Sequence, residues 1–328
     1  MRHSTTRREF LRTASLLAVV PSILPERHFR AQQIHHIGYF NGDIPALTNG
    51  FIAELEGLGF KEGENVRIEK RLQQPNSDGS AMAAELAKMD LSLVVAGALP
   101  FALQIRKNNP DMPMVIGTCP GMVSNRFAAS LERPAGIYTG MDELPPGLTT
   151  KRLQLLKSAA PEVSRIALLS TTPGTGGHEI QLEEARKSAP TIGIEVKSYR
   201  AASLEQLKAA LNDIVADGMD GMLNFQGGLS LANRKFIVDF AASNKLPAIY
   251  QATMFAEAGG LMTWAPNLEQ QFKEVAHYVA KILKGAKPGD LAVKHPEKYY
   301  LTLNASTARA LGIHFSKELL AEASKVIE

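Results

Sequence analysis

Polar and small residues recur at the ends of the apolar segments of this 328-residue chain, where a parallel sheet would gather them at one edge. Hydroxyls, amides, one carboxylate and the backbone amides at a helix start suit reversible capture of a small molecule through hydrogen bonds. We expect these groups to converge on one ligand site. The candidate ligand-binding residues are Asn41, Asp43, Ala98, Leu99, Thr118, Thr171, Thr172, Gln226, Tyr250 and Gln251.

Covalent or cofactor chemistry has weaker support. Cys119 is the only cysteine, and the nearest histidines, His35-His36 and His178, have no fixed relation to it in the sequence. Gly174-Thr-Gly-Gly177 is short of a dinucleotide fingerprint, so we expect a loop that opens a helix. Adjacent histidines on a strand face opposite sides, which disfavours a metal pair. We therefore predict no catalytic residue, no cofactor and no metal, and a cleft enzyme using Cys119 stays a less favoured alternative.

The segment from Leu246 to Pro266 organises the candidate site. It begins with a short buried strand, 247–250, whose end would lie at the ligand edge. Gly259-Gly260 follows and can absorb a backbone rotation. Asn267 then has the side chain to cap an amphipathic helix. We interpret the segment as one wall of a ligand cleft together with a hinge strand.

Apolar runs alternate with helical spacing in two successive series, which predicts an α/β fold with parallel sheets and right-handed crossovers. The strands of the two series are expected at 34–40, 66–71, 91–96, 113–117 and 137–140, then at 165–169, 194–199, 219–225 and 247–250. The helices are expected at 45–58, 79–89, 100–107, 146–159, 178–189, 203–216 and 231–243. Two such units facing each other would leave a cleft between them.

The last third of the chain is expected to cross back between the two units. Its pattern predicts helix 268–284, strand 299–303, helix 305–311 and a last helix from Ser316 to the end. The predicted crossings lie near 141–147, 262–268 and 288–298. The predicted domains are an N-terminal lobe, 32–144 with 267–290 returning to it, and a C-terminal lobe, 145–266 with 291–328 returning to it.

Composition is that of a globular protein long enough for two cores, with 45% hydrophobic and 21% charged residues. The formal charge of +3 arises at the start of the chain. Residues 1–31 hold six of the 36 basic and two of the 33 acidic residues, so the rest has 30 basic against 31 acidic. This balance gives no electrostatic reason to expect nucleic acid as a partner.

Residues 1–31 have the order of an export signal. Arg7-Arg8-Glu9-Phe10-Leu11 precedes a short apolar run, Ala14 to Leu24, and an arginine pair at this place is typical of the twin-arginine address. Pro21 interrupts the run, which is too short to span a bilayer stably. We predict a twin-arginine signal peptide, with Ala31 as the best cleavage candidate, and a periplasmic location.

Several motifs distributed over about 290 residues resemble the ABC-transporter substrate-binding proteins related to the tryptophan- and tyrosine-binding lipoproteins. The motifs are Leu58-Gly-Phe-Lys-Glu-Gly63, Leu131-Glu-Arg-Pro134, Lys151-Arg-Leu-Gln-Leu-Leu156, Leu246-Pro-Ala-Ile-Tyr250, Ala258-Gly-Gly-Leu-Met-Thr263 and Lys281-Ile-Leu-Lys-Gly-Ala-Lys-Pro288. The resemblance implies the type I periplasmic-binding fold: two α/β lobes, each a parallel sheet flanked by helices, with a small ligand between them and closure about a hinge.

Two departures from the family bear on the ligand. Members that bind aromatic amino acids usually carry a Thr-Asp-Asn-like triplet where this chain has Asn224-Phe225-Gln226, so the carboxylate expected to hold an α-ammonium is missing there. Cys119-Pro120 stands where many relatives have Asp-Pro. A neutral, aromatic or anionic organic ligand is therefore at least as plausible as an amino acid.

The resemblance implies a binding component that delivers its ligand to an ABC permease and ATPase in the membrane. A different class of function uses the same ligand site: an extracytoplasmic sensor that presents its liganded form to a membrane receptor. A permease and ATPase encoded alongside would favour the first, and a neighbouring sensor kinase would favour the second.

Overall fold

The structure is a computed structural model that describes residues 34–328 apart from 75–76, 173 and 226. Residues 34–328 form one compact unit. The predicted signal peptide, its arginine pair and the Ala31 cleavage site lie outside the described residues. Among the helices of the described part, none is long and apolar enough to cross a bilayer.

The first sheet has five parallel strands in the order β2-β1-β3-β4-β5. The strands are β1 (His35–Gly42), β2 (Val66–Gln73), β3 (Leu93–Ala96), β4 (Met114–Cys119) and β5 (Tyr138–Asp142). β3 and β4 are buried at every residue. Such continuous apolar strands are expected where helices cover both faces of a parallel sheet.

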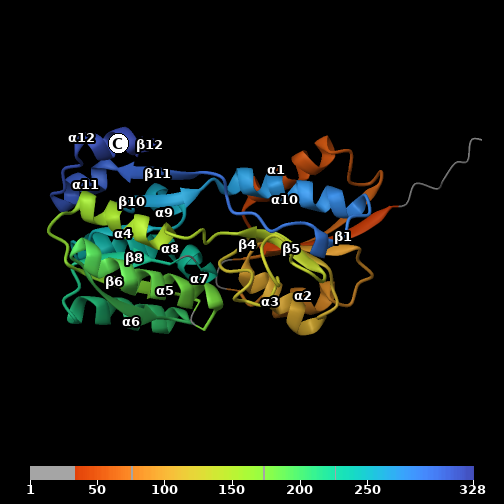
Figure 1. Cartoon of the computed structure of the whole chain (residues 1–328), viewed down its shortest axis with the longest axis horizontal. Coiled ribbons are helices and arrows are strands. Elements are labelled where there is room, and N and C mark those ends of the chain that lie inside the picture. The colour runs from red at the N-terminus through yellow and green to blue at the C-terminus, as the bar shows by residue number, and fades with distance from the viewer. Residues whose placement is uncertain (1–33, 75–76, 173, 226) are drawn as a thin grey trace, which may run out of the picture. The chain divides into compact units, whose positions relative to one another are not determined.

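Two helix pairs cover this sheet. The helices are α1 (Pro45–Gly57), α2 (Ser80–Leu86), α3 (Leu99–Asn108) and α10 (Leu268–Leu283). α1 and α10 lie side by side on one face, although more than 200 residues separate them in the chain (Figure 1). α2 and α3 pack on the other face, around Phe40, Val94 and Ile116. We call this sheet with its four helices the first lobe.

The second sheet has seven strands in the order β12-β11-β10-β9-β8-β6-β7. They are β6 (Arg165–Ser170), β7 (Glu195–Arg200), β8 (Gly221–Asn224), β9 (Ala248–Tyr250), β10 (Met262–Pro266), β11 (Tyr299–Asn304) and β12 (Lys325–Ile327). β6 to β10 pair in parallel, whereas β11 runs antiparallel to β10. This sheet and its helices form the second lobe.

The helices of the second lobe are α4 (Leu148–Ala159), α5 (Gly176–Ser188), α6 (Leu204–Ala216), α7 (Gly228–Ala232), α8 (Arg234–Ser243), α9 (Thr253–Glu257), α11 (Ala305–Leu311) and α12 (Lys317–Glu322). Leucines of α4 and α5 pack against alternate strand residues such as Leu168 and Leu223. α6 and α8 cover the opposite face, against Leu169 and Met222. Both faces of the sheet are therefore buried.

The chain passes between the lobes three times. It crosses after β5, again between β10 and α10, and finally between the 3₁₀ turn η2 (Pro288–Asp290) and β11. This arrangement confirms the predicted two-lobed α/β fold with parallel sheets flanked by helices. The exact lobe boundaries given above remain predictions.

Local chemistry explains where several elements begin. The side chain of Asn267 accepts a hydrogen bond from Gln270 N and caps α10, as predicted. Ser203 caps α6 in the same way. α5 begins at Gly176 behind the capping residue Thr175, which confirms the helix-opening loop expected at 174–177.

Three sequence-based expectations were wrong. The last helix does not run to the end of the chain: α12 stops at Glu322, and Lys325–Ile327 adds β12 to the sheet beside β11. The helix expected at 231–243 is divided into α7 and α8 at Asn233. The segment 253–257, for which no element was expected, forms α9. All three errors concern elements of five residues or fewer, or a break between two helices, where periodicity carries little information.

Candidate functional site

The carboxyl edge of the first sheet brings three predicted ligand residues together. Asn41 at the end of β1 is 4% exposed, and a Cβ atom on Gly97, after β3, would lie 2.1 Å from its Oδ1. Thr118, at the end of β4, donates from Oγ1 to Gly97 O at 3.3 Å. Ala98 follows directly and is the residue before α3. A helix start behind a glycine leaves backbone close to whatever occupies this edge.

Two other residues predicted for the first lobe are placed differently. The side chain of Leu99 is buried in the core under α3, so only its backbone could reach a ligand. Asp43 is exposed, and its Oδ2 accepts a hydrogen bond from Gln74 Nε2 at 2.7 Å. The Asp43 carboxylate thus has a partner at the surface, whereas Asn41 is buried at the edge, where its Nδ2 donates to Tyr39 OH at 3.0 Å and its Oδ1 accepts from Gly42 N at 2.8 Å.

The second sheet also gathers polar side chains at its carboxyl edge. Gln251, after β9, donates from Nε2 to Gln181 Oε1 of α5 at 2.6 Å, and both residues are buried. Thr171, after β6, accepts from Ser230 N at 3.3 Å. Thr172 accepts at its carbonyl from Thr175 Oγ1, at the start of α5. Gln226, the remaining predicted ligand residue here, lies outside the described residues.

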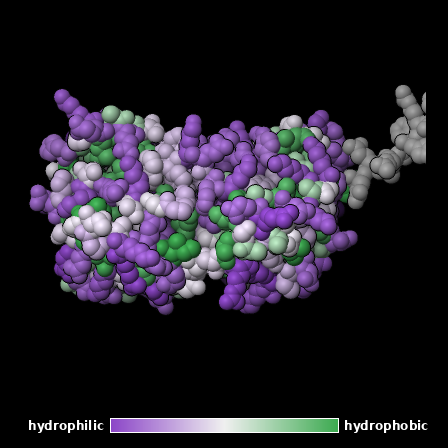
Figure 2. Space-filling view, in the orientation of Figure 1, coloured by the Kyte–Doolittle hydropathy of each residue, from purple (hydrophilic) through white to green (hydrophobic). Residues whose placement is uncertain are grey.

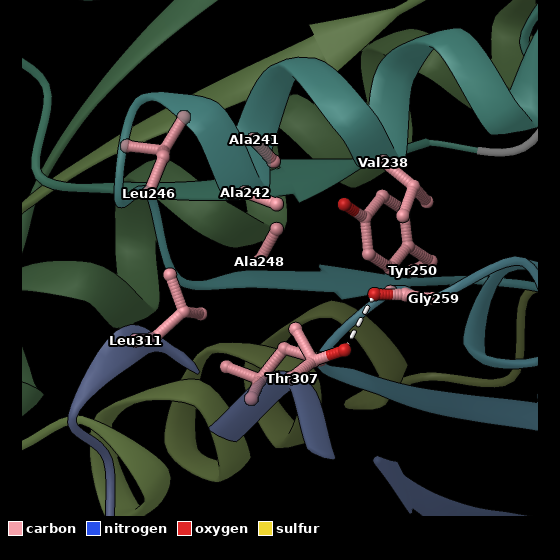
Figure 3. Close-up of a pocket in the computed structure, with 11 residues that line it drawn as sticks. Val238, Ala241, Ala242, Leu246, Ala248, Tyr250, Gly259, Thr307 and Leu311 are labelled. Carbon is pink, nitrogen blue, oxygen red and sulfur yellow. Dashed lines mark hydrogen bonds between the residues drawn. The ribbon is translucent and has the colours of Figure 1, made fainter. Parts of the chain in front are cut away.

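Tyr250 lies in the core of the second lobe and not with Gln251. Its ring stacks on Phe255 with centroids 4.7 Å apart, and burial raises the pKa of its hydroxyl. The ring also lines a small cavity with Val238 and Leu246 (Figure 3). Neighbouring strand residues point to opposite faces, which explains why Gln251 reaches α5 while Tyr250 packs under α8. The predicted ligand role of Tyr250 has no geometric support.

The cavity of Figure 3 has a volume of about 10 Å³, which is the space of about one water molecule. Its lining is mostly aliphatic, with Ala241 and Leu311 among its walls. Thr307 donates to Gly259 O at 2.8 Å beside it, as the dashed line shows. The cavity lies inside one lobe and is too small for an organic ligand.

Sequence reasoning missed two buried polar residues near the edge of the second sheet. Asn224 ends β8 with 0% exposure, and neither its Oδ1 nor its Nδ2 has a hydrogen-bond partner. His178, in the first turn of α5, has two unpartnered ring nitrogens and meets Phe225 edge-on at 5.9 Å. Burial lowers the pKa of His178 and so favours the neutral ring. A buried polar group without a partner costs about 1–3 kcal/mol, and a bound ligand would remove that cost.

A third group of side chains, in which Glu143, Arg152 and Gln271 are buried and two aromatic residues are half-buried, lies where the chain crosses between the lobes. We call it the hinge cluster, and it consists of Glu143, Arg152, Trp264, Gln271 and Tyr299. Arg152 donates from Nε and Nη2 to Trp264 O at 3.0 and 2.9 Å. Gln271 donates to Gly117 O at 2.8 Å, and Tyr299 donates to Glu143 O at 3.1 Å. The indole of Trp264 stacks on the Tyr299 ring.

The charges of the hinge cluster are only partly satisfied. Glu143 Oε1, Arg152 Nη1 and Gln271 Oε1 have no hydrogen-bond partner. Burial raises the pKa of Glu143 to about 7, although the nearby guanidinium of Arg152 opposes the shift. Burial also lowers the pKa of Arg152 to about 10. The sequence held one signal of this arrangement: Arg152 occupies the apolar face of α4, four residues after Leu148.

A second contact between the lobes is made by glycines. We call it the glycine seam, and it joins residues 120–125 of the first lobe to 175–177 of the second. Asn125 Oδ1 accepts from Gly176 N at 3.0 Å, while its Nδ2 donates to Pro120 O at 2.8 Å. A Cβ atom on Gly177 would lie 2.1 Å from Pro120 O. The seam therefore needs glycine where the two backbones meet.

Cys119 is buried in the core of the first lobe with Met122 and Phe127. Burial raises the pKa of its thiol well above the usual value, and the carboxylate of Asp142 adds to the shift. A nucleophilic cysteine requires a thiolate that a substrate can reach. Neither condition is met at this position, which argues against the alternative of a cleft enzyme.

Two parallel sheets whose carboxyl edges carry buried polar side chains, joined by three crossings, define a two-lobed solute-binding protein of the type I periplasmic-binding kind. The family model described as "ABC transporter substrate binding protein" matches residues 43–327. The chain belongs to this family, as its sequence motifs indicated. Known members of the family are solute-binding proteins.

Individual relatives agree with this assignment. A tyrosine-binding protein of Clostridioides difficile is 22% identical over 269 residues, covering 82% of this chain and 77% of the relative. An ABC domain from Streptococcus pneumonia, solved in complex with L-Trp, superposes with a TM-score of 0.81 at 23% identity, covering 90% of this chain and 100% of the other. A conserved domain protein from Vibrio cholerae gives a TM-score of 0.80 at 24% identity with the same coverage.

Proposed function

We propose that the protein captures a small organic ligand between its two lobes, outside the cytoplasm, and delivers it to an ABC permease with its ATPase. The observation that carries this proposal is the pairing of two polar edges. Asn41 and Thr118 lie at one edge, and Asn224 and Gln251 lie at the other. Groups of this kind bind by hydrogen bonds and perform no covalent step.

The unpartnered atoms at the second edge support a ligand that fills the site. Asn224 is fully buried with no hydrogen bond to its amide, and His178 is buried with no hydrogen bond at either ring nitrogen, although its Nε2 lies 3.8 Å from Glu179 Oε1. These atoms can together donate and accept hydrogen bonds. A ligand that carries both donors and acceptors would satisfy them.

The named relatives favour an amino acid or a similar molecule among the candidate ligands. One relative is a tyrosine-binding protein, and one similar structure holds L-Trp. The missing carboxylate at Asn224-Phe225-Gln226 is the argument for a different head group. The ligand proposed here is therefore a small polar organic molecule, with aromatic amino acids as the first compounds to test.

We also propose the route by which the protein leaves the cytoplasm. The arginine pair Arg7-Arg8 and the apolar run that follows favour export by the twin-arginine machinery to the periplasm. Replacing both arginines with lysine should leave a full-length precursor in the cytoplasmic fraction. Unchanged export of the double variant would overturn this route and leave the binding function untouched.

Native mass spectrometry of the purified protein tests the binding function. We expect a retained small molecule, or stabilisation by members of a panel of amino acids and related organic acids in a thermal-shift titration. A ligand at 100 times its dissociation constant should raise the free energy of unfolding by about 2.7 kcal/mol. No bound mass and no stabilisation by any compound would contradict the proposal.

Delivery to a permease needs a separate measurement. The liganded protein should stimulate ATP hydrolysis by the permease and ATPase reconstituted in vesicles, and the ligand-free protein should not. Stimulation of a receptor kinase in place of the ATPase would instead establish the sensor function.

A further inference from the structure

We infer that the hinge cluster forms the charge-recognising end of the ligand site, where Glu143 and Gln271 accept from a cationic N–H group and Arg152 donates to an anionic oxygen. This inference rests on the proposed function and narrows its ligand to a zwitterion. It also places the carboxylate for an ammonium group at Glu143, on a different segment from 224–226.

The hinge cluster is continuous with the edge of the first sheet. Gln271 Nε2 donates to Gly117 O, one residue before Thr118 in β4. Thr118 Oγ1 in turn donates to Gly97 O, beside the amide of Asn41. Direct contacts therefore lead from Asn41 to Gln271, and Glu143 lies next to the Gln271 side chain. The cluster is therefore continuous with Asn41 and Thr118 among the predicted ligand residues.

The neighbouring carboxyl groups of Asp142 and Glu143 differ in their hydrogen bonds. Asp142 and Glu143 are both buried. The oxygens of Asp142 accept from the backbone N–H groups of Gly121, Met122 and Leu144. Glu143 Oε1 accepts from none. Asp142 thus holds the loop after β4 in place, whereas Glu143, whose carboxyl group lies against Gln271, has one oxygen, Oε1, without a hydrogen bond.

The unpartnered atoms are complementary to the two charged groups of a zwitterion. Glu143 Oε1 and Gln271 Oε1 are acceptors and match an ammonium, while Arg152 Nη1 is a donor and matches a carboxylate. A hydrogen bond between Glu143 Oε1 and Arg152 Nη1 would have satisfied both atoms, but the structure does not form it. Charge-assisted hydrogen bonds are about twice as strong as neutral ones, so a zwitterion fits here better than a neutral ligand.

The position of these residues would couple ligand charge to the hinge. Glu143 and Gln271 follow or begin elements of the first lobe, and Arg152 belongs to α4 of the second. Arg152 is held by Trp264 O at the second crossing, and Tyr299 at the third crossing donates to Glu143 O. A ligand that pairs with both Glu143 and Arg152 would therefore contact both lobes, at residues that are held by the chain crossings.

Calorimetric titration with three compounds that share one ring tests the inference. The compounds are L-tyrosine, tyramine, which lacks the carboxylate, and 3-(4-hydroxyphenyl)propionate, which lacks the ammonium. The wild-type protein should bind L-tyrosine at least 10-fold more tightly than either analogue. L-Tryptophan with tryptamine and indole-3-propionate forms a second set if the ring of tyrosine is not accepted.

Glu143→Gln should lower the affinity for the amino acid at least 10-fold and leave the affinity for the propionate unchanged. Arg152→Lys should weaken the propionate and the amino acid but not the amine. Glu183→Gln and Arg186→Lys, on the exposed side of α5, are matched controls and should change none of these affinities. Thermal unfolding of each unliganded variant separates loss of binding from loss of fold.

Equal affinity of a folded Glu143→Gln variant for the amino acid would overturn the inference. So would wild-type protein that binds a neutral ligand and ignores every zwitterion, and that result would leave the proposed binding function intact. Failure of all small molecules to bind would instead contradict the proposed function.

Discussion

The glycine seam and the hinge cluster both join the two lobes, but they differ in their chemistry. The glycine seam is neutral, its backbones touch, and Asn125 has partners at both ends of its amide. The hinge cluster buries a carboxyl and a guanidinium and leaves atoms of both unpartnered. The seam therefore depends on close fit between the lobes. The hinge cluster depends on charge that a second molecule can complete.

This difference suggests that the seam and the hinge cluster act in different ways when the ligand is captured. The seam residues belong to no crossing, so an outward movement of one lobe would separate them. The hinge cluster consists of residues at or beside the crossings. Ligand charge would then act at the hinge, and shape would act at the seam.

The largest effect is expected from Arg152→Met. The change removes two hydrogen bonds to Trp264 O and leaves Glu143 buried without its nearby guanidinium. Breaking a buried charge arrangement in this way costs about 3–5 kcal/mol in the free energy of unfolding. Urea denaturation at pH 8, where Glu143 is ionised, measures the loss.

The double variant Arg152→Met/Glu143→Gln is its control. Removing the carboxyl should recover part of the lost stability, because the two residues interact. Additive effects of the two single changes on the free energy of unfolding would show that Glu143 and Arg152 are independent and would reduce the hinge cluster to ordinary packing.

Glu143→Gln should change how stability depends on pH. The pKa of Glu143 is raised from 4.5 to about 7, so the native state keeps a proton that the unfolded state releases. Its contribution to stability is fully present below pH 4.5 and is lost as the pH rises through 7. The loss is about 3 kcal/mol over this window.

The glutamine variant should lack this loss, so the difference in stability between variant and wild type should grow from pH 4.5 to pH 7.5. Denaturant titrations at several pH values measure it. Because His178 titrates in both proteins, the difference isolates Glu143. Parallel curves for the two proteins would contradict the assigned pKa and its cause.

Gly177→Ala tests the seam. The new Cβ would lie 2.1 Å from Pro120 O, so the lobes could not keep their contact. Overpacking of this kind costs about 1–3 kcal/mol, which corresponds to roughly a 5- to 150-fold loss in ligand affinity. Stability without ligand should change little, because the second lobe can keep its own fold. Gly50→Ala in α1, where nothing lies within 4 Å, is the matched control and should bind normally.

Asn125→Ala and Asn125→Asp should give the smallest effects. Alanine removes the acceptor for Gly176 N and both bonds that hold the turn at Pro120, with a loss of about 1 kcal/mol or severalfold in affinity. Aspartate keeps an acceptor for Gly176 N but loses the donor. An affinity of the aspartate variant as low as that of alanine would assign the effect to the turn and not to the contact between lobes.

Much of the fold could be predicted from the sequence because it follows from local patterns. Buried strands separated by amphipathic helices imply parallel sheets, and the caps at Asn267 and Ser203 follow from residue type alone. β12 was missed because three residues have no periodicity of their own and are held by pairing with β11. The packing of Tyr250 in the core of the second lobe could not be predicted, because a one-residue step decides the face toward which a strand side chain points.

The hinge cluster was less predictable because its residues meet only in three dimensions. Glu143, Arg152 and Gln271 belong to segments that look like a loop, a helix and another helix in the sequence. Only the crossings bring them together. The glycines at 176–177 were recognised as a helix start, but their second role depends on a loop more than 50 residues earlier in the chain.

The surface of the protein is of mixed polarity. Figure 2 shows a face that is mostly hydrophilic with apolar patches among polar ones. Exposed large apolar side chains come from separate elements, such as Val123 in the seam loop, Ile180 in α5 and Phe236 in α8.

A crystal structure of the protein with the small molecule that it retains, or with the tightest compound of the panel, tests the central claim most directly. We expect a ligand enclosed between the two sheets, with contacts to Asn41 or Thr118 on one side and to Asn224 or Gln251 on the other. A ligand bound on the outer surface, or contacts confined to one lobe, would contradict it.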